Sequence, residues 1–230
     1  MHLRLPGIAW QGGCISLIRK RHKRGRQMEQ IYFALVDTPG FFASVIRKVT
    51  GIDYIHVVLS MDEELQEAYS VGRRNPAIPI LAGFEKEDTQ KIERVFPTAR
   101  YKIVSLECTR EQKAELSRQL RECYEKRFQY HYCVLGLPMI LLNIPFYQKN
   151  HYTCSSFTAN ILQENGIELF DKHFSLVTPR DFYELEQTST IYEGTLSKFN
   201  RLNGCYPVKR RNMFRKMWRK LSYAMNGVYL

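Results

Sequence analysis

The chain has 230 residues, of which 44% are hydrophobic and 25% charged, so it can bury one sizeable core and is not a disordered protein. The formal net charge of +11 is concentrated at the ends, since residues 1–27 carry seven Lys or Arg, residues 198–230 carry nine, and neither segment contains Asp or Glu. Such ends suit a nucleic acid, an anionic membrane or another polyanionic partner, and they are equally typical of solvated arms.

The six cysteines show no regular spacing and no CxxC pair, so we expect neither a disulfide framework nor a zinc site. The longest apolar run, Cys133–Phe146, is too short to span a bilayer and contains two prolines. No secretory signal is apparent, because the Arg/Lys cluster follows the short apolar N-terminal segments instead of preceding them. We therefore expect a cytoplasmic protein with reduced thiols, whose basic ends would allow membrane association.

Alternation, helical periodicity and turn residues predict the elements of the chain. In chain order they are a buried strand at Gln30–Asp37, a helix ending at Gly51, a hairpin of strands Asp53–Ser60 and Leu65–Gly72, a Pro- and Gly-broken loop at Arg73–Gln90, a strand at Tyr101–Glu107, and helices at 109–128, 154–165 and from Pro179. We predict an α+β domain over residues 28–196, with a small antiparallel sheet packed against helices. A basic N-terminal arm (1–27) and a basic, helical C-terminal extension (197–230) flank it.

Cys154 lies where the polar segment "KNHYT" meets a predicted helix. Buried cysteines are common and usually inert. The start of a helix, however, presents free N–H groups and a positive dipole end, which favour a thiolate. Its neighbours Thr153, Ser155 and Ser156 are polar, and the helix behind it has apolar residues that anchor it to a core. Cys154 is therefore our candidate nucleophile.

A thiol nucleophile needs a base, and His56 is the histidine that lies within a predicted strand. A strand histidine is also common as a satisfied structural residue. With a turn at Met61–Glu64, the returning strand would bring Glu67 opposite His56, where it could orient the imidazole. Glu67 is equally consistent with a solvated strand residue, and a shift in register would bring Tyr69 or Ser70 to the same place.

Three motifs together resemble the circularly permuted, YiiX/YebB-like branch of the NlpC-type papain-like hydrolases. They are "HVVLS" followed by "LQEAYS", then "CSSF" at the nucleophile helix, then "TPRDF" at Thr178–Phe182. The resemblance covers about residues 28–190. It implies a permuted papain-like fold in which the His strand precedes the Cys helix, with no cofactor or metal.

The resemblance implies a cysteine hydrolase of the peptidase, amidase or esterase type, acting on an amide or ester that includes acyl or peptide substrates. Cys154 would attack the carbonyl, His56 would accept the thiol proton, and Glu67 would orient His56. The backbone N–H of Cys154 and a second donor would hold the oxyanion, with Tyr32 as a further helper.

Two other functions stay open at this stage. A lipid acyltransferase would use the apolar segment Gly136–Tyr147 to line an acyl groove, although the same segment could simply cover the core. A non-catalytic binding protein would dock on nucleic acid or an anionic membrane through its basic ends and would not depend on Cys154. The oligomeric state is not indicated by the sequence.

Overall fold

The computed structural model describes residues 27–39, 44, 47, 51, 53–75 and 78–204. The basic arm, apart from Gln27, and the predicted C-terminal helix lie outside these residues, as does most of the predicted helix that ends at Gly51. The description below therefore concerns the domain between the two basic ends.

Six strands of the described residues form one antiparallel sheet, ordered β4-β3-β2-β1-β5-β8. Their bounds are β1 Met28–Asp37, β2 His56–Ser60, β3 Ala68–Asn75, β4 Ile78–Lys86, β5 Arg100–Thr109 and β8 Ser189–Thr195. The central strand β1 pairs with β2 and β5, so that Tyr32 lies opposite both Ser60 and Ser105. Its run of apolar residues fits a strand covered on both faces.

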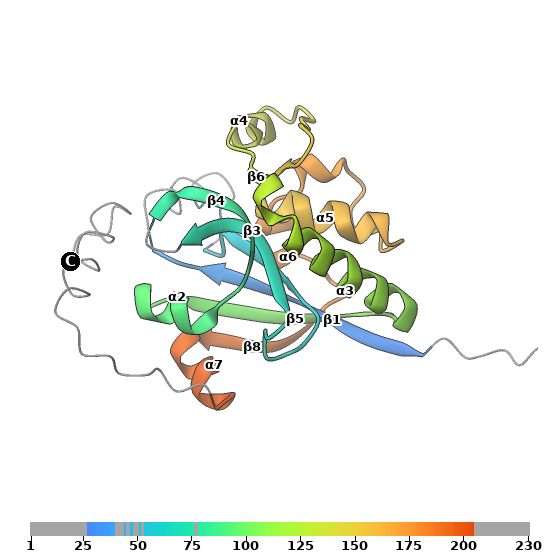
Figure 1. Cartoon of the computed structure of the whole chain (residues 1–230). Coiled ribbons are helices and arrows are strands. Elements are labelled where there is room, and N and C mark those ends of the chain that lie inside the picture. Colours follow the sequence, from blue (N-terminus) through green and yellow to red (C-terminus); the bar gives the residue numbers. More distant parts are fainter. Residues whose placement is uncertain are drawn as a thin grey trace, which may run out of the picture.

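Helices cover both faces of the sheet (Figure 1). One face packs against α3 (Arg110–Glu125), α5 (Cys154–Glu164) and α6 (Pro179–Tyr183), whose buried side chains include Leu116, Phe157 and Phe182. The other face packs against α2 (Thr89–Val95) and α7 (Leu196–Leu202), with Leu196 and Phe199 buried. The expected α+β class is confirmed, and the sheet is larger than we predicted.

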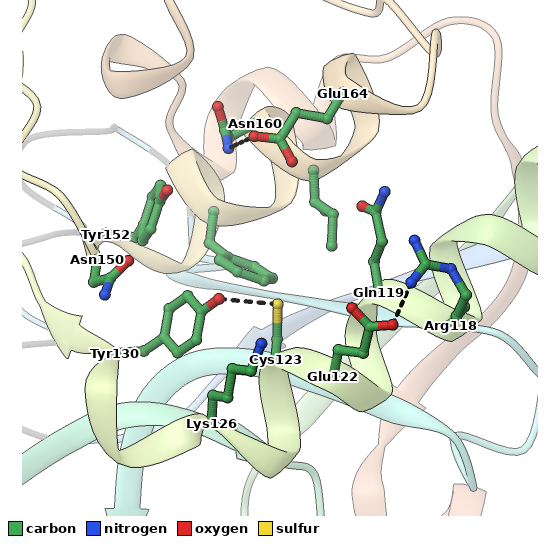
Figure 2. A pocket seen from close by; sticks show the side chains of 12 residues that line it. Arg118, Gln119, Glu122, Cys123, Lys126, Tyr130, Asn150, Tyr152, Asn160 and Glu164 are labelled. Atoms are coloured by element: carbon green, nitrogen blue, oxygen red, sulfur yellow. Dashed lines mark hydrogen bonds and ion pairs between the residues drawn. The ribbon is translucent and has the colours of Figure 1, made fainter.

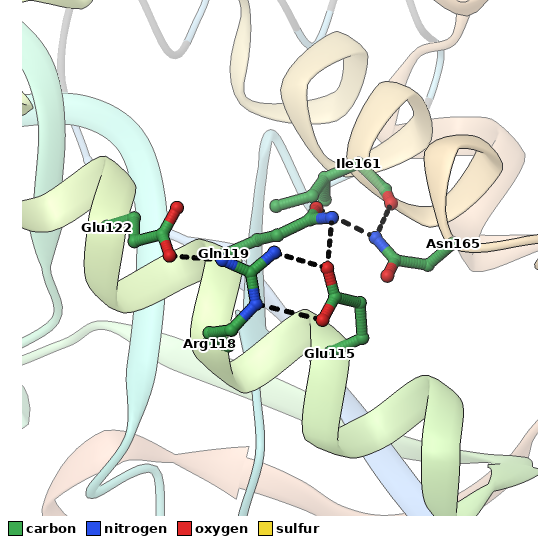
Figure 3. Close-up of polar contacts among 6 residues, drawn as sticks. All are labelled: Glu115, Arg118, Gln119, Glu122, Ile161 and Asn165. Atoms are coloured by element: carbon green, nitrogen blue, oxygen red, sulfur yellow. Dashed lines mark hydrogen bonds and ion pairs between the residues drawn. The ribbon is translucent and has the colours of Figure 1, made fainter.

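Polar contacts tie α3 to α5, the helix that carries Cys154 (Figure 3). The Asn165 amide at the end of α5 donates to Gln119 Oε1 of α3 at 2.9 Å and to the Ile161 carbonyl at 2.7 Å. On α3, Arg118 forms ion pairs with Glu115 and Glu122. The bond from Asn165 to Gln119 joins the C-terminal end of α5 to α3, whereas the ion pairs of Arg118 lie within α3.

Short elements connect α3 to α5. They are the 3₁₀ turn η1 (Arg127–Gln129), the parallel pair of β6 (His131–Tyr132) and β7 (His151–Tyr152), and α4 (Gly136–Leu141) between these two strands; the 3₁₀ turn η2 (Phe174–Leu176) follows α5. Figure 1 shows α4 projecting away from the sheet and its covering helices. None of the helices in the described residues has the length and apolar character needed to cross a membrane.

Strands β4 and β8 and helices α2 and α7 were not predicted. The segment Arg73–Gln90 was expected to be a loop, yet β3 continues to Asn75 and β4 occupies Ile78–Lys86. Proline cannot donate to a ladder, but β4 is an edge strand, where Pro79 is tolerated. The folded body also continues past residue 196, because α7 buries Phe199 and Asn200.

Candidate active site

Helix α5 begins at Cys154, as predicted. Thr153 is its N-cap, and a reciprocal capping box joins Thr153 to Ser156: the Ser156 N–H donates to Thr153 Oγ1 at 3.2 Å, and Ser156 Oγ accepts from the Thr153 N–H at 2.8 Å. The Ser155 hydroxyl donates to the Val177 carbonyl at 2.6 Å. The polar residues that suggested a reactive cysteine therefore serve to fix the start of the helix and hold the thiol in place.

The thiol of Cys154 is buried, with 4% of the residue exposed. Burial raises its pKa to about 11, although the backbone N–H groups of Val57, Ser155 and Cys154 itself favour the thiolate. The N–H groups at the helix end favour the thiolate, as expected, but the cost of burying the charge outweighs them, so that the pKa of the thiol is raised. At neutral pH the resting group is a protonated thiol.

His56 is the first residue of β2, and its ring nitrogen Nε2 lies 3.1 Å from Ser70 Oγ on β3. Burial, and secondly the charge of Arg73, lower the pKa of His56 to about 4, so the imidazole is neutral at pH 7. The next residue, Val57, presents its backbone N–H to the sulfur of Cys154. The sulfur therefore lies beside the backbone of the residue that follows His56, and the hydrogen bond found for the imidazole is the one to Ser70 and not one to the thiol.

The predicted contact between Glu67 and His56 is not formed. Glu67 precedes β3, and its carboxylate accepts from Arg121 at 2.8 and 3.0 Å and from Ser117 at 2.9 Å, both on α3. These bonds, with that to Arg121 the strongest, lower the pKa of Glu67. The connection runs over Met61–Glu67 and not over four residues, because the pairing resumes with Ser60 opposite Ala68.

This longer connection places Gly72 beside His56. A Cβ at residue 72 would lie 2.8 Å from His56 Cε1, so the absence of a side chain makes room for the imidazole. Ser70, one of the two alternatives to Glu67 left open by the sequence, is the residue that contacts His56. Tyr69 instead packs in the core beneath α3 and α5, where its ring stacks on Phe84.

A carboxylate that the sequence did not reveal continues the network behind Ser70. Ser70 Oγ donates to Glu87 Oε2 at 3.5 Å, and the Tyr101 hydroxyl donates to Glu87 Oε1 at 3.2 Å. Burial raises the pKa of Glu87 to about 7, while these two hydrogen bonds and the charge of Arg73 favour the ionised form. Glu87 directly follows β4, in a segment that was expected to be a loop. Because the strand was not predicted, nothing in the sequence indicated that this carboxylate lies near Ser70.

Two further side chains complete the surroundings of the thiol and imidazole. Arg73 donates to Thr38 Oγ1 at 3.1 Å, and its guanidinium carbon lies 4.8 Å from the centroid of the Phe96 ring. Burial, and secondly the proximity of Cys154, raise the pKa of Tyr132 well above its ordinary value. Tyr32, the expected helper, instead has its hydroxyl 3.4 Å from Gln30 Oε1 and does not join this cluster.

Figure 2 shows a pocket of about 330 Å³ between α3 and α5. Its lining includes Tyr130, Tyr152 and Cys123, and the Tyr130 hydroxyl lies 3.2 Å from Cys123 Sγ. Neither Cys154 nor His56 lines it. This pocket is therefore separate from the thiol and imidazole, and we assign it no part in their chemistry.

Within the part of the chain that the structure describes, no group of three His, Cys, Asp or Glu side chains is close enough together to hold a metal ion. Comparisons of the chain with protein-family models, with curated proteins and with solved structures found no significant match. The resemblance to NlpC-type papain-like hydrolases stays a prediction, and the chemistry of the site is inferred from its own residues.

Proposed function

We propose that the protein is a cysteine hydrolase that cleaves an ester or amide through a thioester on Cys154, with His56 as the general base. The observation that carries the proposal is the hydrogen-bonded series His56–Ser70–Glu87, beginning one residue from the backbone N–H that faces the Cys154 sulfur. A nucleophile, a base and a group that orients the base are the parts that such catalysis needs.

The hydrogen-bond directions indicate which imidazole nitrogen acts. Ser70 donates to the Glu87 carboxylate, so its oxygen accepts from the Nε2–H of His56. That tautomer leaves Nδ1 with the lone pair that can accept the thiol proton. Glu87, acting through Ser70, then takes the orienting role that the sequence had assigned to Glu67.

The reaction would begin from neutral groups, because the pKa of Cys154 is raised to about 11 and that of His56 is lowered to about 4. The sulfur attacks the carbonyl carbon as its proton passes to His56, and the backbone N–H groups of Cys154 and of Val57 or Ser155 are suited to hold the oxyanion. The imidazolium then protonates the leaving group. Water, or another acceptor in the case of acyl transfer, resolves the thioester.

The test uses p-nitrophenyl butyrate, a small ester with a good leaving group that a thiol paired with a base can cleave. We expect the full-length protein to release p-nitrophenolate and to carry one butyryl group, which peptide mapping by mass spectrometry should place on Cys154. Cys108→Ala, which alters another buried cysteine, is the matched control and should be acylated normally. Absence of an adduct, or an adduct that persists in Cys154→Ala, would show that Cys154 is not the nucleophile.

The orienting residue can be tested with a matched pair of variants. Ser70→Ala removes the hydroxyl that holds the imidazole and should lower the rate constant for acylation by roughly tenfold or more, because an unheld base samples the wrong tautomer and orientation. Glu67→Gln breaks a contact with α3 and should leave the rate within about twofold, since exposed ion pairs contribute little. Stopped-flow release of p-nitrophenolate measures both, and the reverse order of effects would restore Glu67 as the orienting group.

A further inference from the structure

Residues 134–147, between β6 and β7, form an uncharged arm that projects from the domain. Residues 133–148 contain no Asp, Glu, Lys, Arg or His. The arm exposes a group of large apolar side chains, namely Val134 (61%), Leu135 (60%), Leu141 (60%), Leu142 (65%), Ile144 (49%) and Tyr147 (48%). Folded domains seldom leave so many neighbouring apolar side chains in water without an interaction that covers them.

The base of this arm is fixed to the domain, so its apolar tip is held outward (Figure 1). The Phe146 N–H donates to Ser175 Oγ at 3.1 Å, and the Tyr147 and Tyr152 hydroxyls are 3.1 Å apart. The Tyr147 ring also packs edge-on against Phe174, with centroids 5.3 Å apart. Of the six residues of α4, the helix at the tip, Gly136 is the one that is buried.

The chemistry along the arm changes in the order in which a lipid leaflet changes with depth. The tip is aliphatic, and the base carries Tyr147 together with His131 and His151, whose ring centroids are 5.0 Å apart, with Lys149 between Tyr147 and His151 in the chain. Interfacial anchors show this sequence of apolar, aromatic and basic groups. An anionic surface would also attract a chain with a net charge of +11 whose two ends carry bases and no acids.

We propose that the arm, residues 134–147, docks the protein on an anionic lipid bilayer by inserting its apolar tip among the lipid headgroups. We infer that the arm binds a bilayer rather than a groove of another protein. The tip projects, and it carries no charge or paired polar group that would fix a single orientation in a protein groove. The docking role of this surface does not depend on the proposed reaction.

The experiment compares two leucines of equal exposure. Leu142 on the arm is 65% exposed and Leu202 at the end of α7 is 67% exposed, so neither Leu142→Glu nor Leu202→Glu should disturb folding. Binding of the full-length variants to mixed phosphatidylcholine–phosphatidylglycerol vesicles is measured by co-sedimentation in high salt, which screens the basic ends. We expect Leu142→Glu to lower the partition coefficient by at least tenfold and Leu202→Glu to change it less than about twofold.

Equal vesicle binding by both variants and the unchanged protein would overturn the proposal. It would also be overturned if Leu142→Glu left vesicle binding intact but dissociated an oligomer in size-exclusion chromatography, since the arm would then be a contact between copies of this chain. Acylation by p-nitrophenyl butyrate, a substrate dissolved in water, should be the same in Leu142→Glu as in the unchanged protein. Failure of docking is thereby distinguishable from failure of the proposed enzyme chemistry.

Discussion

Replacing His56 with alanine should lower the rate constant for acylation of Cys154 by p-nitrophenyl butyrate by about 10²–10⁴, the usual contribution of a general base. The loss should be large here because the thiol begins protonated, with its pKa raised to about 11 by burial. Without the imidazole, the sulfur must lose its proton to solvent from within the domain. Stopped-flow measurement of the first turnover gives the acylation step separately from release of the acid.

The control for this prediction is His173→Ala. His173 is exposed, its ring packs on Phe174, and its Nδ1 lies 2.7 Å from Ser175 Oγ, so it resembles His56 in having a serine partner but is not part of the site. Its replacement should leave acylation unchanged. A thermal melt establishes that both variants fold. Equal rates in folded His56→Ala and the unchanged protein would remove His56 from the mechanism.

The second large effect concerns the stability of two variants, His56→Gln and Glu87→Gln, whose free energies of unfolding should change with pH in opposite directions. Burial lowers the pKa of His56 from 6.5 to about 4, so the unfolded chain binds a proton in this range that the folded protein does not. His56 therefore contributes stability that is present above pH 6.5 and is lost as the pH falls to 4. Burial raises the pKa of Glu87 from 4.5 to about 7, so its contribution is present below pH 4.5 and is lost as the pH rises to 7.

These two contributions oppose one another in the unchanged protein and should nearly cancel between pH 4.5 and 6.5. His56→Gln leaves the Glu87 contribution, so its free energy of unfolding should fall as the pH rises through this range, by up to about 3 kcal/mol. Glu87→Gln leaves that of His56, so its free energy of unfolding should rise with pH by a similar amount. Urea denaturation at several pH values measures both slopes.

Glu186→Gln, which alters an exposed carboxyl, should keep the profile of the unchanged protein. Slopes of the same sign in His56→Gln and Glu87→Gln would mean that the two groups are not buried as a neutral imidazole and a partly protonated acid. The hydrogen-bonded series through Ser70 would then not describe the site.

Elements with a strong local pattern were predictable from the sequence. The strand at β5 was expected at Tyr101–Glu107 and found at Arg100–Thr109, and the capping box of Thr109 and Gln112 correctly marked the start of α3. The start of α5 at Cys154 was also correct. In each case residues close together in the chain decide the conformation, either by alternation or by bonds between a cap and the first turn.

Edge strands escaped prediction because their sequences resemble loops. Strand β4 contains Pro79 and Gly83, residue types that are typical of loops, and β8 is mostly exposed, so it shows no buried alternating pattern. Their place at the two edges of the sheet makes these residues acceptable, but that place depends on the whole topology. Missing β4 also meant missing Glu87, the carboxylate that follows it.

The residue opposite His56 was predicted wrongly because the length of the turn between β2 and β3 could not be read from the sequence. The Asp62 carboxylate accepts from the backbone N–H groups of Gln66 and Glu67, which extends the connection to Glu67 and moves this residue out of the strand. The protonation states of Cys154 and His56 were likewise hidden, because burial by distant elements determines both pKa values.

The pH profile of the acylation rate constant tests most directly whether the imidazole of His56 takes the thiol proton of Cys154. If it does, the rate should form a plateau between the two pKa values, about 4 for His56 and about 11 for Cys154, after subtraction of spontaneous ester hydrolysis. In His56→Ala the plateau should be lost, and the rate should rise in proportion to hydroxide concentration towards the pKa of the thiol. A proportional rise of the same kind in the unchanged protein would contradict the account, because the thiol would then lose its proton without the imidazole.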